Sequence, residues 1–370
     1  MKKLLFATCC IAFLSGSLGA AAQKKSVAKN VLTQTLNGKS WSADNGNGTF
    51  TNPLFYDEFS DPDIIRVGED YYLAGTTMHS VPGLVVLHSK DLVNWEFSSY
   101  CFDRFDDSDD FNLRNGKEAY GQGIWAPAIR YHNGKFYIFS NINGHGLQVY
   151  ISDSAKGPWT HHKVNGDIYD LSVLFDEDGK IYAVHKYGNV TVTELKPDLS
   201  GPVEGSSKVV IPEGNAMGEG HHVYKINDMY YILSADYSPM GRMQCARSKS
   251  IWGPYETCVI SERESYGYAA GWSVGNMGIG RPLPEDGFSF QNNKPNGLNL
   301  GCATIHQGGI VQAPDGKWWG VSMQDFNAVG RTVCLSPITW VDGWPYFGLE
   351  KNLGRSPRTW FKPNDMVKTP

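Results

Sequence analysis

The stretch Phe59–Leu73 reads FSDPDIIRVGEDYYL and places an acidic residue, Asp61, at the start of an apolar run. The run is followed by a Gly-Glu-Asp turn and a pair of tyrosines, a pattern typical of a β-hairpin. Asp before Pro often begins a turn, so Asp61 by itself has an ordinary structural explanation. Whether the pattern recurs along the chain therefore decides how Asp61 is interpreted.

The same unit, an apolar strand, a polar turn and an aromatic strand, occurs five times, and a weaker second hairpin follows most copies. The five first hairpins read DIIRVGEDYYLAGTT, AIRYHNGKFYIFSNI, VLFDEDGKIYAVHK, VYKINDMYYILSAD and GIVQAPDGKWWGVSMQ. Four-stranded sheets cannot bury both of their faces alone. We therefore predict that five of them stack radially as an all-β, five-bladed β-propeller, with the hairpin aromatics packed between blades.

The composition agrees with one large, turn-rich β domain, because the 370 residues include 41 Gly and 19 Pro and hardly any apolar spacing typical of helices. We expect a lead-in at residues 23–50, the propeller at 51–361 and a tail at 362–370. Five cysteines lie beyond the N-terminal leader without close pairs, and we expect them to be buried and unreactive: Cys101, Cys245, Cys258, Cys302 and Cys334.

Residues 1–22 have the features of a secretory signal peptide: two lysines, a short apolar run and a small-residue end before Gln23. The apolar run is too short and broken to span a membrane. We therefore predict an exported protein, either periplasmic or extracellular. Loss of Lys2 and Lys3 with the signal moves the formal charge from −5 to −7, which argues against a nucleic-acid partner and suits a neutral substrate.

Unusual side chains recur at one place before each first-hairpin turn. Counted back from Asp70 in the first unit and from its counterparts in the others, the spacing is nine residues in four units and ten in the fifth. The residues so placed are Asp61, Trp125, Asp170, Glu219 and His306. Inner strands of a propeller line its central channel, so these positions are predicted to converge on one axial funnel.

Six segments, in order along the chain, resemble glycoside hydrolase family 43. They read NPLFYDEFSDPDIIRVGEDYYL, GIWAPAIRYHNGKFYIF, DLSVLFDEDGKIYAV, GEGHHVYKINDMYYIL, HQGGIVQAPDGKWWGV and VGRTVCLSPITWVDGWPYFG. The likeness runs from about Asn52 to Phe361 and is greatest to the branch of α-L-arabinofuranosidases and β-D-xylosidases. It implies a five-bladed propeller and an exo-acting, inverting glycosidase that removes terminal α-L-arabinofuranosyl or β-D-xylosyl units from plant hemicellulose oligosaccharides or side chains.

The resemblance implies roles for three carboxylates: Asp61 as general base, Glu219 as general acid, and Asp170 as the group that orients the acid and adjusts its pKa. Hydrolysis with inversion needs an ionised carboxylate to activate water and a protonated one to donate to the leaving oxygen. A third negative charge near Glu219 would raise its pKa and keep it protonated. We expect Asp63 to be a structural acid, and residues 176–178 to be solvated turn residues.

The resemblance also implies four sugar-binding side chains, which are Trp125, Met78, His222 and Arg331. His221 stands where many family members have Pro. Neighbouring side chains on a strand point to opposite faces, so His221 and His222 can hardly share one metal ion. His306 is either a ligand of a structural Ca²⁺ or a buried, hydrogen-bonded histidine, and the chemistry requires no cofactor.

Two other functions remain open from the sequence. A non-catalytic carbohydrate-binding propeller would not need Asp61, Asp170 and Glu219 together. A retaining fructan- or sucrose-cleaving enzyme of the related invertase group is disfavoured, because the Asn-Asp-Pro-Asn-Gly and Arg-Asp-Pro signatures are missing. The long segment Ser261–Ala303, rich in Gly, Asn and Pro, is expected to be a functional loop over the funnel.

Overall fold

The computed structural model describes residues 42–78, 84–103, 108–119, 123–215, 217–237, 240–261, 305–325, 331–354 and 359–363. The chain divides into a short unit, Met1–Ser42, and a large unit, Ala43–Pro370. The predicted signal peptide and all but the first residue of the predicted loop at 261–303 lie outside the described residues. None of the helical structure in the described ranges is long and apolar enough to cross a membrane.

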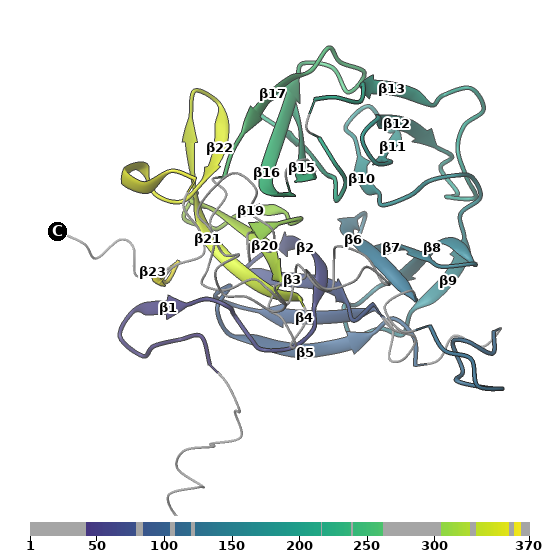
Figure 1. Ribbon diagram of the computed structural model, residues 1–370, viewed down its shortest axis with the longest axis horizontal. Coiled ribbons are helices and arrows are strands. Elements are labelled where there is room, and N and C mark those ends of the chain that lie inside the picture. Colours follow the sequence, from purple (N-terminus) through teal and green to yellow (C-terminus); the bar gives the residue numbers. More distant parts are fainter. Residues whose placement is uncertain are drawn as a thin grey trace, which may run out of the picture. The chain divides into compact units, whose positions relative to one another are not determined.

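The large unit consists of consecutive antiparallel sheets arranged around a centre as blades of a propeller (Figure 1). Blade 1 contains β2 (Ser60–Val67), β3 (Asp70–Thr76), β4 (Val85–Ser89) and β5 (Trp95–Tyr100). Blade 2 contains β6 (Ile124–His132), β7 (Lys135–Ile142), β8 (Gly146–Ser152) and β9 (Thr160–Lys163). Blade 3 contains β10 (Ser172–Phe175), β11 (Ile181–His185), β12 (Val190–Leu195) and β13 (Lys208–Ile211).

Blades 4 and 5 complete the ring. Blade 4 contains β14 (His222–Ile226), β15 (Met229–Tyr237), β16 (Met240–Ser248) and β17 (Glu256–Val259). In blade 5 the inner strand is split into β18 (Ile305–His306) and β19 (Ile310–Gln312), which both pair with β20 (Trp318–Asp325). The blade continues with β21 (Arg331–Val341) and β22 (Trp344–Phe347), and one 3-10 turn, Glu350–Asn352, follows.

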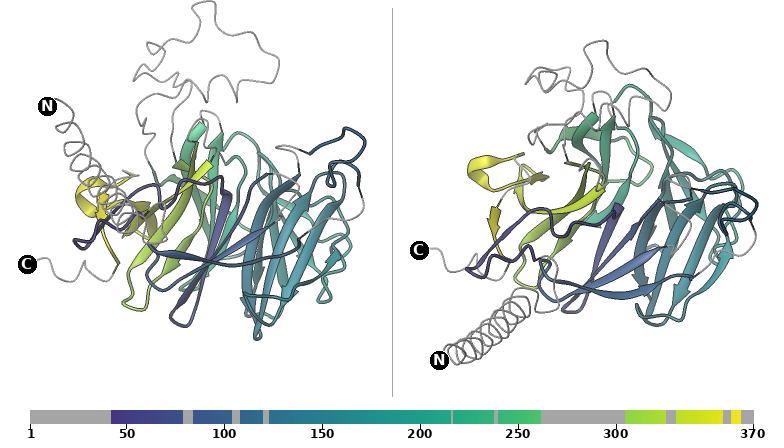
Figure 2. Two further views of the ribbon diagram at one scale, coloured as in Figure 1. Left: turned by 90° about the horizontal axis from the view of Figure 1, so that it is seen from below. Right: turned by 60° about the horizontal axis from the view of Figure 1, so that its bottom comes forward.

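The hairpin turns explain why the strands pair in this register. Asn133 and Gly134, between β6 and β7, both have positive φ angles (48° and 80°), as do Asn227 and Asp228 between β14 and β15 (49° and 60°). Two-residue turns with positive φ at both positions match the right-handed twist of the flanking strands. The side views in Figure 2 show the blue and teal strands of blades 2 and 3 standing side by side.

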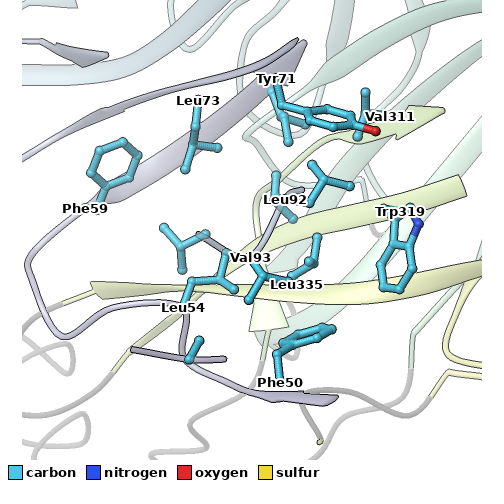
Figure 3. Packing of buried hydrophobic residues seen from close by; sticks show 14 of the residues in the cluster. Phe50, Leu54, Phe59, Tyr71, Leu73, Leu92, Val93, Val311, Trp319 and Leu335 are labelled. Atoms are coloured by element: carbon cyan, nitrogen blue, oxygen red, sulfur yellow. The ribbon is translucent and has the colours of Figure 1, made fainter. Parts of the chain in front are cut away.

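The hydrophobic core is divided among the spaces between neighbouring blades. Each of the five interblade spaces holds one cluster of buried apolar side chains. Figure 3 shows the cluster between blades 1 and 5, in which Leu92 and Leu335 lie between Phe59 on one side and Trp319 on the other. Each sheet therefore covers its neighbours, as the repeat predicted.

The ring closes between blades 5 and 1 through the segment before β2. The short strands β1 (Thr49–Thr51) and β23 (Thr359–Phe361) pair at this seam. The Asn52 side chain accepts a hydrogen bond from the Leu335 amide and donates one to the Leu335 carbonyl, both at 2.8 Å. The amide of Leu54 donates to Val333, and that of Phe59 to Arg331.

The five-bladed prediction is confirmed, and several details differ. The second hairpin of blade 3 escaped the sequence pattern because a long connection, residues 196–207, separates β12 from β13. The compact unit begins at Ala43, before the predicted start at residue 51, since Ala43 and Phe50 belong to the core. Cys101, Cys245 and Cys334 are buried free thiols, Cys258 is half-buried, and Cys302 lies outside the described residues.

Candidate active site

A pocket opens at the centre of the ring, where the inner strands begin. Its volume is about 140 Å³, which is small beside the roughly 300–1,000 Å³ of sites for drug-sized ligands. Every blade contributes to its wall. The described lining residues are Asp61, Met78, Trp125, Ala126, Tyr169, Asp170, Glu219, Gln307 and Arg331.

A left-handed bend at the start of each inner strand shapes this wall. One residue per blade has a positive φ there: Asp61 (51°), Ala126 (28°), Asp170 (51°), Gly220 (67°) and Gln307 (44°). A regular strand would send successive side chains to opposite faces. The bend breaks that alternation, so adjacent residues such as Tyr169 and Asp170 both reach the pocket.

The strand pairing and the bends correct the predicted equivalence of the ring positions by one residue in blades 1 and 3, because Asp61 and Asp170 are bend residues whereas Trp125 and Glu219 precede their bends. Asp70 pairs with Val67 and so belongs to β3, whereas Gly134 lies in the turn between His132 and Lys135. The counterpart of Trp125 is therefore Ser60, and Asp61 matches the bend residue Ala126. Asp61 nevertheless faces the pocket, because the bend falls on Asp61 itself.

Asp61 lies where blades 1 and 5 meet, and its side chain is largely buried, with 8% exposed. Its Oδ1 is 3.3 Å from Nη1 of Arg331, the first residue of β21. Its backbone amide points at the sulfur of Met323, 3.4 Å away. A nearby guanidinium favours the ionised form of a carboxyl group. Asp61 is thus placed to act as an anionic group at the pocket wall.

Asp170 and Glu219 lie in the wall formed by blades 3 and 4. The Gly220 amide donates to Oδ2 of Asp170 at 2.7 Å, and the Tyr169 hydroxyl donates to Oε2 of Glu219 at 3.1 Å. Burial raises the pKa of Asp170 well above its ordinary value, and the charges of Glu219 and Asp61 raise it further. The Gly220 amide and Arg331 oppose this rise. The pocket therefore favours retention of a proton among its carboxyl groups.

The turn that carries Asp170 is held by Asn141 of β7. The Asp170 amide donates to Oδ1 of Asn141 at 3.0 Å, and Nδ2 of Asn141 donates to the Ile168 carbonyl at 2.8 Å. The bend at Gly220 needs glycine for a second reason besides its positive φ. A Cβ there would lie 2.1 Å from the Gln307 side chain. Neighbouring blades thus fix the positions of both acidic segments.

Three of the predicted sugar-binding residues line the pocket, namely Trp125, Met78 and Arg331. The Trp125 ring meets the Tyr169 ring edge to face, with centroids 6.3 Å apart. Its indole nitrogen is buried and has no hydrogen-bond partner among the described residues. A sugar hydroxyl is a suitable acceptor for this donor, because buried polar groups are normally paired.

His222, the fourth predicted sugar-binding residue, lies beneath the pocket and is absent from its described wall. The side chain is buried, with Nδ1 3.0 Å from the Gly220 carbonyl and Nε2 3.5 Å from Oδ1 of Asp63. Burial lowers the pKa of His222. The bend at Gly220 turns Glu219, three residues before the first residue of β14, toward the pocket, and His222 lies further along the strand.

Asp63 is the centre of a buried network below the pocket, as expected of a structural acid. It accepts hydrogen bonds from the Ile129 amide at 2.9 Å and from Nη1 of Arg130, both in blade 2. Gly309 leaves room for this network, because a Cβ there would lie 2.4 Å from the Tyr224 hydroxyl and 3.2 Å from Oδ1 of Asp63. The network links the inner strands of blades 1, 2, 4 and 5.

The turn acids 176–178 differ from the prediction at one position. Glu177 and Asp178 are exposed, but Asp176 is buried. Its carboxylate accepts hydrogen bonds from Lys225 at 3.1 Å and from the Tyr230 hydroxyl at 2.6 Å. These bonds lower the pKa of Asp176 although its burial opposes them. Asp176 therefore joins blades 3 and 4 at the turn between β10 and β11.

The predicted metal position is His306, the last residue of β18, whose side chain lies outside the described parts. The described residues contain no group of three or more His, Cys, Asp or Glu able to hold a metal ion. Calcium prefers roughly six to eight oxygen ligands, and the described carboxylates do not assemble such a cage. The calcium site stays a prediction.

Sequence reasoning missed three wall residues, Ala126, Tyr169 and Gln307. Each is a bend residue or stands next to one. Each is also the sequence neighbour of a predicted ring position, namely Trp125, Asp170 or His306. Propensity did not reveal the bends at Ala126 and Gln307, because Ala and Gln rarely adopt positive φ.

The chain is similar in sequence to known proteins. The model of glycosyl hydrolases family 43 matches residues 50–267. A putative β-xylosidase from Xylanibacter ruminicola is 31% identical over 347 residues, covering 90% of this chain and 57% of the relative. A non-reducing-end α-L-arabinofuranosidase from Bacteroides ovatus is 34% identical over 316 residues, covering 81% of this chain and 54% of the relative. The chain thus spans little more than half the length of these two relatives.

Solved structures give the same grouping. A bifunctional GH43-CE protein from Bacteroides eggerthii superimposes with a TM-score of 0.68 at 32% identity, over 85% of this chain and 37% of that one. An engineered GH43 glycoside hydrolase with endo-xylanase and exo-arabinofuranosidase activity superimposes with a TM-score of 0.66 at 28% identity, over 85% of this chain and 56% of that one.

Proposed function

Because the chain belongs to glycosyl hydrolase family 43, we propose that it is an exo-acting glycosidase that works with inversion on plant hemicellulose. Its substrates are terminal α-L-arabinofuranosyl or β-D-xylosyl units of oligosaccharides or side chains. The names of the similar proteins, a β-xylosidase and an α-L-arabinofuranosidase, support this substrate class. A small pocket lined by residues of all five blades supports attack on a single terminal sugar.

The observation that carries the proposal is the convergence of three carboxyl groups with different surroundings on one pocket. Asp61, at the start of blade 1, lies beside Arg331 of blade 5. Asp170 and Glu219 lie together where blades 3 and 4 begin. Inverting hydrolysis needs two acids in different protonation states. Arg331 supports an ionised Asp61, and mutual repulsion among buried carboxyl groups supports one retained proton.

In the proposed reaction, the ionised Asp61 accepts a proton from a water molecule as the water oxygen bonds to the anomeric carbon. Glu219 donates its proton to the glycosidic oxygen as the bond from that oxygen to the anomeric carbon breaks. Attack and departure occur on opposite faces of the sugar, so the anomeric configuration inverts. Asp170, held by the Gly220 amide, lies close enough to Glu219 for the two carboxyl groups to resist simultaneous ionisation, so the pair retains the proton that Glu219 donates.

Binding of the terminal sugar falls to the remaining wall residues. Trp125 offers an aromatic face and an indole N–H, Met78 an apolar surface, and Arg331 a donor for a sugar hydroxyl as well as for Asp61. His222 acts indirectly in this proposal, by supporting the Gly220 carbonyl from below. We also propose that residues 1–22 direct export, which suits a polymeric substrate outside the cell.

The test compares hydrolysis of nitrophenyl α-L-arabinofuranoside and nitrophenyl β-D-xyloside by the intact protein and by two isosteric variants, Asp61→Asn and Glu219→Gln. We expect Asp61→Asn to lose at least about 10²-fold in kcat/KM on the nitrophenyl pentosides. Glu219→Gln should lose as much on a pentosyl-oligosaccharide, whose leaving group must be protonated. Asp153→Asn, at an exposed position outside the pocket, is the matched control. NMR of the first-formed product gives its anomeric configuration.

Each outcome distinguishes the candidates. An active protein that stays active in both variants would refute the assigned roles. Retention of configuration would refute the inverting mechanism. An intact protein that binds pentosides without hydrolysing them would favour the non-catalytic propeller.

A further inference from the structure

We infer that the Tyr169 hydroxyl fixes which oxygen of Glu219 carries the proton given to the leaving group. This inference rests on the proposed function and assigns to Tyr169 a role that neither the motifs nor the comparisons give it. The hydroxyl lies 3.1 Å from Oε2 of Glu219, inside the pocket wall. Tyr169 is a positioning residue, because it acts on the substrate through Glu219.

The direction of this hydrogen bond follows from the chemistry of the two groups. Burial raises the pKa of Tyr169, and the nearby charges of Glu219 and Asp170 raise it further. The phenol therefore keeps its proton and donates it to Oε2. When Glu219 is protonated, Oε2 is then the carbonyl oxygen and Oε1 is the hydroxyl oxygen. Only Oε1 can give its proton to the glycosidic oxygen.

Tyr169 and Glu219 are held in register by the same residue, Lys186, which follows β11. The Lys186 amide donates to the Tyr169 carbonyl at 2.9 Å. The Lys186 carbonyl accepts a hydrogen bond from Nε2 of His221 at 2.6 Å. A carbonyl oxygen only accepts, so Nε2 of His221 bears the hydrogen. His221 thereby ties the segment of Glu219 to the segment of Tyr169.

The aromatic ring of Tyr169 is fixed as well. It meets Trp125 edge to face, and the next residue, Asp170, is held through Asn141. The hydroxyl group can therefore be removed without loss of the ring contacts. Phe at position 169 keeps the ring and deletes one donor, which makes Tyr169→Phe a conservative test.

The inference predicts a dependence on the leaving group. A dinitrophenyl pentoside has a leaving group that departs without protonation, whereas a pentosyl-oligosaccharide needs the acid. We expect Tyr169→Phe to lower kcat for the oligosaccharide about 10- to 100-fold, within the range that general acids supply. The kcat for the dinitrophenyl pentoside should change less than about threefold.

A pH profile gives the second readout. A donor hydrogen bond stabilises the ionised form of a carboxyl group, so its loss should move the basic limb of kcat/KM upward by about one pH unit. Replacement of Tyr169 by 3-fluorotyrosine, a stronger donor of nearly the same shape, should move that limb downward. Tyr131→Phe, at an exposed tyrosine in β6 outside the pocket wall, should move neither quantity.

These outcomes separate the inference from the proposed function. Equal losses on both substrates with an unmoved basic limb would overturn the inference while leaving the glycosidase assignment intact. An intact protein inactive on all pentosides would overturn both. If Tyr169→Phe does not fold, the fluorotyrosine protein decides alone, and an unmoved or upward-shifted limb would count against the inference.

Discussion

The buried network at Asp63 allows a sharp test of what holds the blades together. The Asp63 side chain is 1% exposed. It accepts hydrogen bonds from the Ile129 and Ile64 amides and pairs with Arg130, whose side chain is 12% exposed. Asp63→Ala leaves the Ile129 amide unpaired, which costs about 1–3 kcal/mol of stability. It also leaves the buried guanidinium of Arg130 without its carboxylate partner. Loss of one partner of a buried pair costs about 3–5 kcal/mol altogether. We expect the free energy of unfolding to fall by that amount.

Urea denaturation followed by tryptophan fluorescence measures this change. The matched control is Asp153→Ala, which removes the partner of Lys135 in an exposed pair with side chains 83% and 47% exposed. That variant should lose less than about 1 kcal/mol. The double variant Asp63→Ala with Arg130→Met should be destabilised less than the sum of its single changes, because the stranded charge is also removed.

A specific result would refute this reasoning. If Asp63→Ala and Asp153→Ala lower the free energy of unfolding equally, the network below the pocket does not hold the blades. Strict additivity of the two changes at positions 63 and 130 would show that the charges do not stabilise each other.

Three further predictions concern single positions. Because the pKa of Asp170 is raised in the folded protein, this residue makes the protein less stable as pH rises from about 4. Asp170→Asn should therefore raise the melting temperature at about pH 7, and this gain should vanish near about pH 4. The same variant should lose hydrolysis. Burial lowers the pKa of His221 to about 4, so its contribution to stability is lost as pH falls from about 6.5 to 4. In His221→Gln, the decrease in the free energy of unfolding between about pH 6.5 and about pH 4 should be smaller by about 3 kcal/mol, as measured by urea denaturation across this range. Gly309→Ala should lower the free energy of unfolding by about 1–3 kcal/mol, because its Cβ meets Tyr224; an unchanged urea midpoint would mean that the space is not tightly packed.

The repeat of hairpins predicted the fold well because turn chemistry and alternation are local properties of the sequence. Asn133 and Gly134 specify their turn through positive φ angles, and the aromatic strands supply the layers between blades. The long connection between β12 and β13 hid one hairpin because that signal depends on a short turn.

The site was predicted in part. Spacing and resemblance selected Asp61, Asp170 and Glu219, which do face one pocket. The exact wall depended on bends that propensity does not indicate at Ala126 and Gln307, and Tyr169 was missed. His222, predicted to bind sugar, lies outside the described wall. Burial of Asp176 was likewise unpredictable, because its partners Lys225 and Tyr230 come from the next blade.

The seam of the ring has a consequence for synthesis of the chain. Asp61 belongs to the first blade and Arg331 to the last, yet they are paired across the junction that Asn52 and β23 fasten. A growing polypeptide therefore carries Asp61 without its partner Arg331 until most of the chain has emerged. The pair therefore forms only when the last blade packs against the first, and a translation product that ends before β21 would lack it.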